Sequence, residues 1–299
     1  MLISSIAFMV MAAQDAGQFK GHTREVSCVA VSPNGKMMAS GGVDHTVRLW
    51  DPQSKRMSME LTGHDGEVHC VAFSPDSKLL ASGEMYKKLK IWDVATGKEL
   101  HTFADSEGAI LGVAFSPDGK RVFAACKDNA ARVWTVGSDG QAVIFKHNWA
   151  VNGIAASPDG KTIATIDDGG SINIWDASTL KQVATWNHAS SGRALAFSGD
   201  GKTLVSGGGG VVKSWDFAEG KERGSFECEA NAVAVAADGS SILVGTQDNL
   251  TILLKGADLS VVWKQEKHER PVTGAAISPD GSMAFTSSMD YTLRAWRLK

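Results

Sequence analysis

Cysteine is scarce in this chain, and its four cysteines, Cys28, Cys70, Cys126 and Cys228, never show the C-x-x-C spacing. Zinc sites and thiol redox motifs depend on such spacing, so their sequence signature is absent. Cys28 and Cys70 occupy corresponding positions of a sequence repeat where other copies have glycine or alanine. Because small residues alternate there, we interpret both thiols as small core residues and expect neither a disulfide nor a metal.

Long runs of like charge and long apolar runs are also absent. The chain has 30 lysines and arginines against 33 acidic residues, a formal net charge of −3, without any block of five or six like charges. This argues against binding to nucleic acid or to anionic lipid. The longest apolar run, residues 2–11, is far shorter than the roughly 20 residues needed to cross a bilayer, so we expect no integral membrane segment.

Signatures of metal or cofactor binding are missing as well. The eight histidines do not gather at metal-ligand spacing, and Asp167-Asp168 lacks the series of oxygen ligands that calcium needs. The run from Gly207 to Gly210 is not followed by the Gly-Lys-Ser/Thr of a phosphate-binding loop, and we interpret it as a tight hairpin turn. We therefore expect no cofactor.

The feature that is present is a repeat marked by tryptophan. Six tryptophans lie 42, 42, 41, 40 and 81 residues apart, and Leu254 stands in the double gap: Trp50, Trp92, Trp134, Trp175, Trp215 and Trp296. A turn such as SPNG (32–35) or SPDG (116–119) precedes most of them. A period near 40 residues indicates one repeat architecture, so residues 14–299 are interpreted as a single domain of seven units.

Each unit reads as four short strands. Residues 68–93 contain three segments with alternating apolar residues, joined by a Ser-Pro-Asp turn and a polar turn, and a fourth segment follows each tryptophan, as in 98–103. The first segment is apolar on both faces, which is typical of sheets that pack radially around an axis.

Two recurring pairs identify a family. A Gly-His pair stands at Gly21-His22 and Gly63-His64, and a Trp-Asp pair closes several units, as at Trp50-Asp51. The chain resembles the WD40-repeat family, which implies an all-β, seven-bladed propeller with four antiparallel strands per blade. Too few residues follow Trp296 for a last fourth strand, so we expect an N-terminal strand at residues 16–20 to complete the last blade.

The resemblance also implies a hydrogen-bonded set of four side chains in each complete blade. In the first unit the set is His22, Ser40, Asp44 and Trp50, and in the last it is His268, Thr286, Asp290 and Trp296. The other units are expected to be incomplete, with these residues at the affected positions: Tyr86 in unit two, Ser106 and Ala124 in unit three, Gly169 in unit four, a shortened unit five, and Phe226 and Leu254 in unit six. Unit six is the expected loosest blade. A hydrolase triad is a poor reading, because these residues recur beside a buried aromatic side chain.

If the family arrangement holds, the loops before the first strands and the turns between second and third strands share one rim. The residues chosen there as partner-binding are Trp149, Arg24, Arg270, Tyr86, Tyr291 and Lys127, with Asp167 and Asp168 nearby. Trp, Tyr and Arg dominate binding hot spots, and Trp149 is the first choice unless it folds back over a neighbouring loop.

By resemblance, the chain is expected to be a monomeric, non-enzymatic scaffold that binds a protein or peptide. One alternative is an exported binder of glycans or of the cell envelope, in which Trp149 stacks on a sugar. Another is an enzyme with a site at the mouth of the central channel, where His69, Asn152, Arg193 and Asn231 share one register. A polar, solvated channel lining explains these four residues better.

Residues 1–13 lie outside the repeat. Their apolar run followed by Ala12-Ala13 suits a secretory signal, although no Lys or Arg precedes it and the segment is short. Export is the favoured of two readings and makes the protein secreted or extracytoplasmic. The other reading is an unstructured N-terminus on a cytoplasmic protein.

Overall fold

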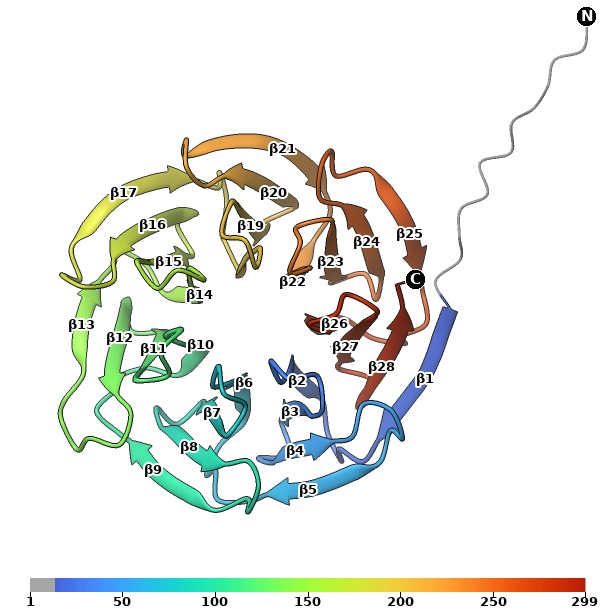
Figure 1. The fold of residues 1–299 in the computed structure, drawn as a ribbon, viewed down its shortest axis with the longest axis horizontal. Helices are drawn as coiled ribbons and strands as arrows, with labels where there is room; N and C mark the ends of the chain where they lie inside the picture. The colour runs from blue at the N-terminus through green and yellow to red at the C-terminus, as the bar shows by residue number, and fades with distance from the viewer. Residues whose placement is uncertain (1–13, 299) are drawn as a thin grey trace, which may run out of the picture.

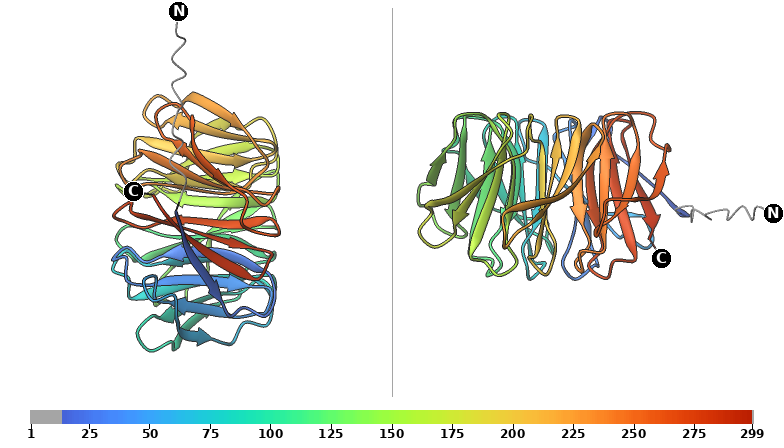
Figure 2. Two further views of the ribbon diagram at one scale, coloured as in Figure 1. Left: turned by 90° about the vertical axis from the view of Figure 1, so that its right-hand side faces the viewer. Right: turned by 90° about the horizontal axis from the view of Figure 1, so that it is seen from above.

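The protein is a closed ring of seven β-sheets. The structure, a computed structural model, describes residues 14–298, which contain 28 strands arranged as seven sheets of four. The sheets stand radially around a central axis (Figure 1), and the side views show a flat disc (Figure 2). The seven-bladed propeller expected from the tryptophan period is confirmed. Among residues 14–298, there is no helix of the length and hydropathy needed to cross a membrane.

Blades are numbered in chain order, and each lists its strands from the axis outward. Blade one contains β2 (Val26–Val31), β3 (Met38–Gly42), β4 (Val47–Trp50) and β5 (Met57–Leu61). Blade two contains β6 (Val68–Phe73), β7 (Leu79–Glu84), β8 (Leu89–Asp93) and β9 (Glu99–Phe103). Blade three contains β10 (Ile110–Phe115), β11 (Arg121–Cys126), β12 (Ala130–Thr135) and β13 (Val143–Lys146). Blade four contains β14 (Val151–Ala156), β15 (Thr162–Asp167), β16 (Ser171–Asp176) and β17 (Gln182–Asn187).

The remaining blades repeat the pattern. Blade five contains β18 (Ala194–Phe197), β19 (Thr203–Gly208), β20 (Val211–Asp216) and β21 (Lys221–Glu227). Blade six contains β22 (Ala230–Val235), β23 (Ser241–Thr246), β24 (Thr251–Lys255) and β25 (Val261–Gln265). Blade seven contains β26 (Val272–Ile277), β27 (Met283–Ser288), β28 (Thr292–Arg297) and β1 (Gln14–Lys20).

The ring is closed by the N-terminal strand. β1 pairs antiparallel with β28, from Gln14 opposite Arg297 to Lys20 opposite Thr292, and Figure 1 shows the blue strand beside the dark red one. Phe19 on β1 is fully buried and contacts the rings of Trp50 in blade one and Phe285 in blade seven. This clasp covers the outer edge of β28, as the short C-terminal tail had predicted.

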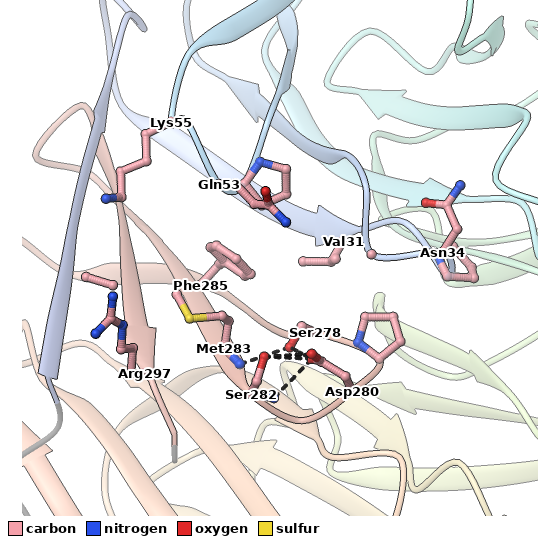
Figure 3. Close-up of a pocket in the computed structure, with 15 residues that line it drawn as sticks. Val31, Asn34, Gln53, Lys55, Ser278, Asp280, Ser282, Met283, Phe285 and Arg297 are labelled. Atoms are coloured by element: carbon pink, nitrogen blue, oxygen red, sulfur yellow. Dashed lines mark hydrogen bonds between the residues drawn. The ribbon is translucent and has the colours of Figure 1, made fainter.

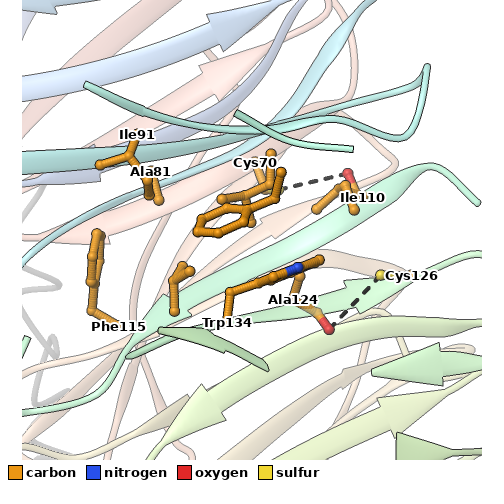
Figure 4. Close-up of a cluster of buried hydrophobic side chains, with 11 residues drawn as sticks. Cys70, Ala81, Ile91, Ile110, Phe115, Ala124, Cys126 and Trp134 are labelled. Atoms are coloured by element: carbon orange, nitrogen blue, oxygen red, sulfur yellow. Dashed lines mark hydrogen bonds between the residues drawn. The ribbon is translucent and has the colours of Figure 1, made fainter. Parts of the chain in front are cut away.

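The core lies between neighbouring blades rather than at one centre. Figure 4 shows one such cluster, in which Cys70 and Ile91 of blade two face Phe115 and Trp134 of blade three. Trp134 also stacks on Phe103, with ring centroids 5.2 Å apart. Because each blade buries one apolar face against the next, the sheets can be apolar on both sides.

The four cysteines are free, and Cys70 and Cys126 are buried. Burial raises the pKa of the Cys28 thiol to about 12 and that of Cys126 to about 11. Buried thiols with raised pKa values are poor nucleophiles and poor metal ligands, which suits packing residues.

Candidate functional site

Hydrogen-bonded side chains fasten the rim loop of blade one to its strands. Nδ1 of His22 lies 2.9 Å from Oδ2 of Asp44, and Nε2 lies 2.7 Å from the hydroxyl oxygen of Ser40. The indole N–H of Trp50 donates to the same hydroxyl at 2.9 Å. Ser40 is fully buried, so it is not placed as an exposed nucleophile. The set instead holds the turn at Asp44 against the loop that carries His22.

Blade seven repeats this arrangement beside the clasp. His268 lies 2.8 Å from Asp290 through Nδ1 and 2.9 Å from Thr286 through Nε2. The indole N–H of Trp296 donates to Thr286 at 3.0 Å. The two blades that meet at the ring closure therefore present rim loops anchored in the same way.

Blades two and four are also complete, which corrects the expectation from the sequence. Oε2 of Glu84 lies 2.8 Å from Nδ1 of His64, and Oδ2 of Asp167 lies 3.1 Å from Nδ1 of His147. Both carboxylates stand two residues before the position of Asp44. Blade one shows why this works, because a Cβ added at Gly42, the corresponding position, would lie 2.8 Å from Nδ1 of His22. A side chain at either position can reach the histidine.

The remaining blades depart further from the pattern. In blade three the indole N–H of Trp134 donates to Asp105 at 2.7 Å, a residue that the sequence reading passed over in favour of Ser106. In blade five His188 lies 2.8 Å from Ser206 and 3.1 Å from the carbonyl oxygen of Gly208, which takes the place of a carboxylate. These substitutions were not visible without the fold, because the partners are twenty or more residues apart.

The rim formed by these loops and turns exposes large apolar side chains. Tyr86, Trp149 and Tyr291 are 59%, 58% and 41% exposed. Met85 and Met289, which the sequence reading missed, are also exposed, and each stands just before one of the turn residues named above. We define the aromatic rim by the following residues: Met85, Tyr86, Trp149, Met289 and Tyr291.

Two of these aromatic rings rest on glycines. A Cβ at Gly169 would come within 2.3 Å of Cδ1 of Trp149, and one at Gly66 within 2.9 Å of Cδ2 of Tyr86. Trp149 therefore does lie over a neighbouring turn, yet more than half of its surface remains open to solvent. The glycine in place of the blade-four aspartate makes room for the indole ring.

Arg270 links blades seven and one on the same rim. Its guanidinium lies 5.9 Å from the ring centroid of Tyr291, and it forms an ion pair with Glu25 at 3.5 Å. Arg24 lines the cavity at the mouth of the channel, and Lys127 is exposed at the turn of blade three. The structure thus places the six sequence-chosen residues on one face of the disc, spread over blades seven, one, two, three and four.

Asp167 does not belong to this surface. It was expected in an exposed turn, but it ends strand β15 and is only 1% exposed, because its carboxylate serves His147. Asp168 is exposed, and its carboxylate accepts hydrogen bonds from Asn152 and Ser191 at 2.6 and 3.1 Å. A pair of adjacent carboxylates beside Trp149 is therefore not available.

The polar residues of the channel mouth mostly tie neighbouring blades together. Asn152 donates to the carbonyl of Gly192 in the loop of blade five, at 2.8 Å, and Arg193 donates to Asn231 of blade six at 2.5 Å. Asn231 in turn donates to the carbonyl of Val272 in blade seven at 3.1 Å. Asn152 and Asn231 occupy bulges of the innermost strands, which turn their side chains toward the next blade.

His69 also lies in an inner-strand bulge and lines the same cavity of about 730 Å³. Burial lowers the pKa of His69, and a general base or acid partner for it is not among the hydrogen bonds of the described residues. Residues 14–298 hold no group of three or more His, Cys, Asp or Glu side chains that could hold a metal ion.

Known proteins similar to this chain share its repeat. A family model described as "WD domain, G-beta repeat" matches residues 14–51, 55–93, 97–135 and 137–176, just over half of the chain. A second model, described as "Outer membrane protein assembly factor BamB", matches residues 159–293.

Similar individual proteins match over about one blade. WD repeat-containing protein 18 of Homo sapiens is 57% identical over 44 residues, which is 14% of this chain and 10% of that protein. Protein groucho of Drosophila melanogaster is 49% identical over 39 residues, 13% of this chain and 5% of that protein. Nuclear distribution protein PAC1 of Candida tropicalis is 50% identical over 34 residues, 11% and 7% of the two chains. The chain thus matches about a tenth of the length of these relatives or less.

Proposed function

The chain belongs to the WD40-repeat family, and from that premise we propose that it is a non-enzymatic scaffold whose aromatic rim binds a protein or peptide partner. The observation that carries the proposal is the exposure of Tyr86, Trp149 and Tyr291 on the anchored loops and turns of one face. Large aromatic side chains bury much surface on binding and lose few rotamers, so they are typical binding anchors.

The rigidity of the rim supports this proposal. Tyr86 and Trp149 lie against glycines, and the histidine networks anchor the loops of blades one, two, four and seven. A surface whose side chains are already held in place loses less conformational entropy when a partner docks. Arg24, Arg270 and Lys127 add positive charge beside the aromatic rings, which favours a partner segment with acidic residues.

A propeller enzyme has less support. Asn152, Arg193 and Asn231, three of the four channel residues considered for catalysis, are engaged in hydrogen bonds between blades. A catalytic site needs a nucleophile or an acid–base pair in mutual reach, and His69 has no such neighbour in a hydrogen bond of the described residues. The polar lining is explained by ring assembly.

Affinity purification from the native host tests the rim proposal. The tagged protein is compared with a Trp149→Ala, Arg24→Ala, Arg270→Ala variant and with a matched control, Lys98→Ala, Lys181→Ala, Val183→Ala, whose residues are exposed away from the rim. We expect the rim variant to lose a partner that the control retains, with unchanged melting temperatures. Equal recovery of partners by all three proteins would rule out the rim.

A second candidate is an exported binder of glycans or of the cell envelope. It draws on the apolar run of residues 2–11, which lies outside the described residues, and on the similarity of residues 159–293 to the outer membrane assembly factor. N-terminal sequencing of the native protein distinguishes the two, because an intact Met1 excludes cleavage of a signal. Glycan-array binding that is lost in Trp149→Ala would favour this candidate.

A further inference from the structure

A cavity lies at the seam where the ring closes, on the face opposite the aromatic rim. It measures about 490 Å³ and is bordered by turns of blades one and seven and by β1. We call it the seam cavity. Figure 3 shows Val31, Met283 and Phe285 at its centre, with Lys55 and Arg297 on the side next to β1.

The cavity exists because β1 has a glycine where other outer strands have a side chain. At the junction of blades one and two, Met59 fills this position, with its sulfur 2.1 Å from where a Cβ of Gly97 would stand. Trp263 packs against Trp296 at the junction of blades six and seven, with ring centroids 5.8 Å apart. Gly17 pairs with Ala295 of β28 as Met59 pairs with Leu49 of β4, so the seam lacks this filling.

Gly17 is also held in a conformation that suits glycine. Its φ is +109°, next to a register shift of β1, and a Cβ there would lie 3.0 Å from Nζ of Lys55. Lys55 itself has φ of +60° in the turn after β4. The local backbone therefore brings the lysine side chain across the seam to β1.

The seam cavity is charged at one side and apolar in its middle. Nζ of Lys55 forms no ion pair within residues 14–298, and Arg297 adds a second cation at the same side. The acidic lining residue, Asp280, accepts hydrogen bonds from the hydroxyl groups of Ser278 and Ser282 at 2.5 and 2.9 Å. Its charge is thus held in its own turn, away from the two cations.

We propose that the seam cavity binds a small amphiphilic carboxylate, namely a medium-chain fatty acid. The carboxylate pairs with Lys55 and Arg297, and the aliphatic chain covers Ala16, Val31 and Met283. Cations at one side and apolar side chains in the middle are complementary to such a ligand in charge and in hydrophobicity. The cavity volume falls in the range of about 300–1,000 Å³ that holds small molecules.

Binding there links to ring closure. A ligand that touches β1, blade one and blade seven at once binds only the closed ring, so it stabilises the folded state by mass action. The seam cavity lies on the opposite face from the aromatic rim, and this proposal does not depend on the proposed partner binding.

Titration of the full chain with octanoate tests the proposal. We expect saturable 1:1 binding by calorimetry, a melting temperature that rises with octanoate concentration, and shifted methyl resonances of Val31, Ala16 and Met283. Acetate lacks the chain and octylammonium lacks the negative charge, so both are expected to bind at least tenfold more weakly.

Variants locate the site. Lys55→Gln with Arg297→Gln is expected to weaken octanoate binding at least tenfold, whereas Lys181→Gln, in the corresponding turn of blade four, leaves it unchanged. Circular dichroism and the melting temperature without ligand show that each variant folds. The proposal is overturned by absent octanoate binding, by equal binding of octylammonium, or by unchanged binding in the double variant.

Discussion

Glu84 and His64 form a buried pair, with Oε2 2.8 Å from Nδ1 and both side chains inaccessible to solvent. The same carboxylate oxygen accepts the backbone N–H groups of Asp65 and Gly66 at 2.9 and 3.2 Å. Burial acts to raise the pKa of Glu84, but these hydrogen bonds outweigh it and hold the pKa below its usual value. Because Glu84 does the work assigned by register to residue 86, Tyr86 is free to face the rim.

The first prediction separates these two residues. Glu84→Ala leaves a buried histidine and two backbone N–H groups without their acceptor, so we expect it to lower the free energy of unfolding by about 2–4 kcal/mol. Tyr86→Ala, at an exposed residue, is expected to change it by less than about 1 kcal/mol. Urea unfolding measures both. Similar losses in the two variants would contradict the assignment of Glu84.

The second prediction concerns the clasp. Deletion of residues 1–20 uncovers β28 and removes Phe19, which is fully buried against Trp50 and Phe285. We expect the melting temperature to fall by several degrees relative to a chain that lacks residues 1–13 alone. Differential scanning calorimetry provides the comparison. Equal melting temperatures for the two truncated chains would show that β1 does not hold the ring.

The third prediction is a loss of stability in acid. Burial acts to raise the pKa of Asp290, but hydrogen bonds from His268 and Thr292 outweigh it and lower the pKa to about 2. Since an unfolded aspartate has a pKa near 3.9, this carboxylate stabilises the fold above about pH 4, and its contribution is lost as the pH falls to about 2.

Asp290→Asn tests that contribution. The variant cannot titrate at this position, so the difference in unfolding free energy between it and the wild type should shrink by about 1–2 kcal/mol from pH 5 to pH 2. Urea titrations at several pH values measure it. A difference that stays constant over this range would contradict the role of Asp290.

The fourth prediction is that blade six opens most readily. Leu254 replaces the tryptophan of the other blades, and the hydroxyl of Thr251 is buried without a hydrogen-bond partner within the described protein. Trp263, buried against Trp296, compensates in part. We expect the amides of β24 and β25 to exchange with solvent faster than those of β4 and β28 in hydrogen–deuterium exchange. Slower exchange in β24 than in β4 would contradict this.

The tryptophan period was enough to predict the number of blades, the strand count and the closing strand, because each follows from the repeat itself. The carboxylates of Glu84 and Asp167 were not predictable, since positions 42 and 44 of a blade both point toward the histidine and a single sequence does not show which one serves it. The hydrogen bonds of Asn152 and Asn231 were missed for another reason. Their acceptors lie in neighbouring blades about 40 residues away, where no local pattern reaches.

Partner binding at the aromatic rim is the central claim, and site-specific photo-crosslinking in the native host tests it most directly. Benzoylphenylalanine is placed at Met85 and Met289 on the rim, and at Val183 on the outer edge of blade four and Lys181 in the turn of the opposite face. We predict that the two rim positions crosslink to the same protein and that Val183 and Lys181 do not. Crosslinks that arise from Val183 or Lys181, with none from the rim, would contradict the account.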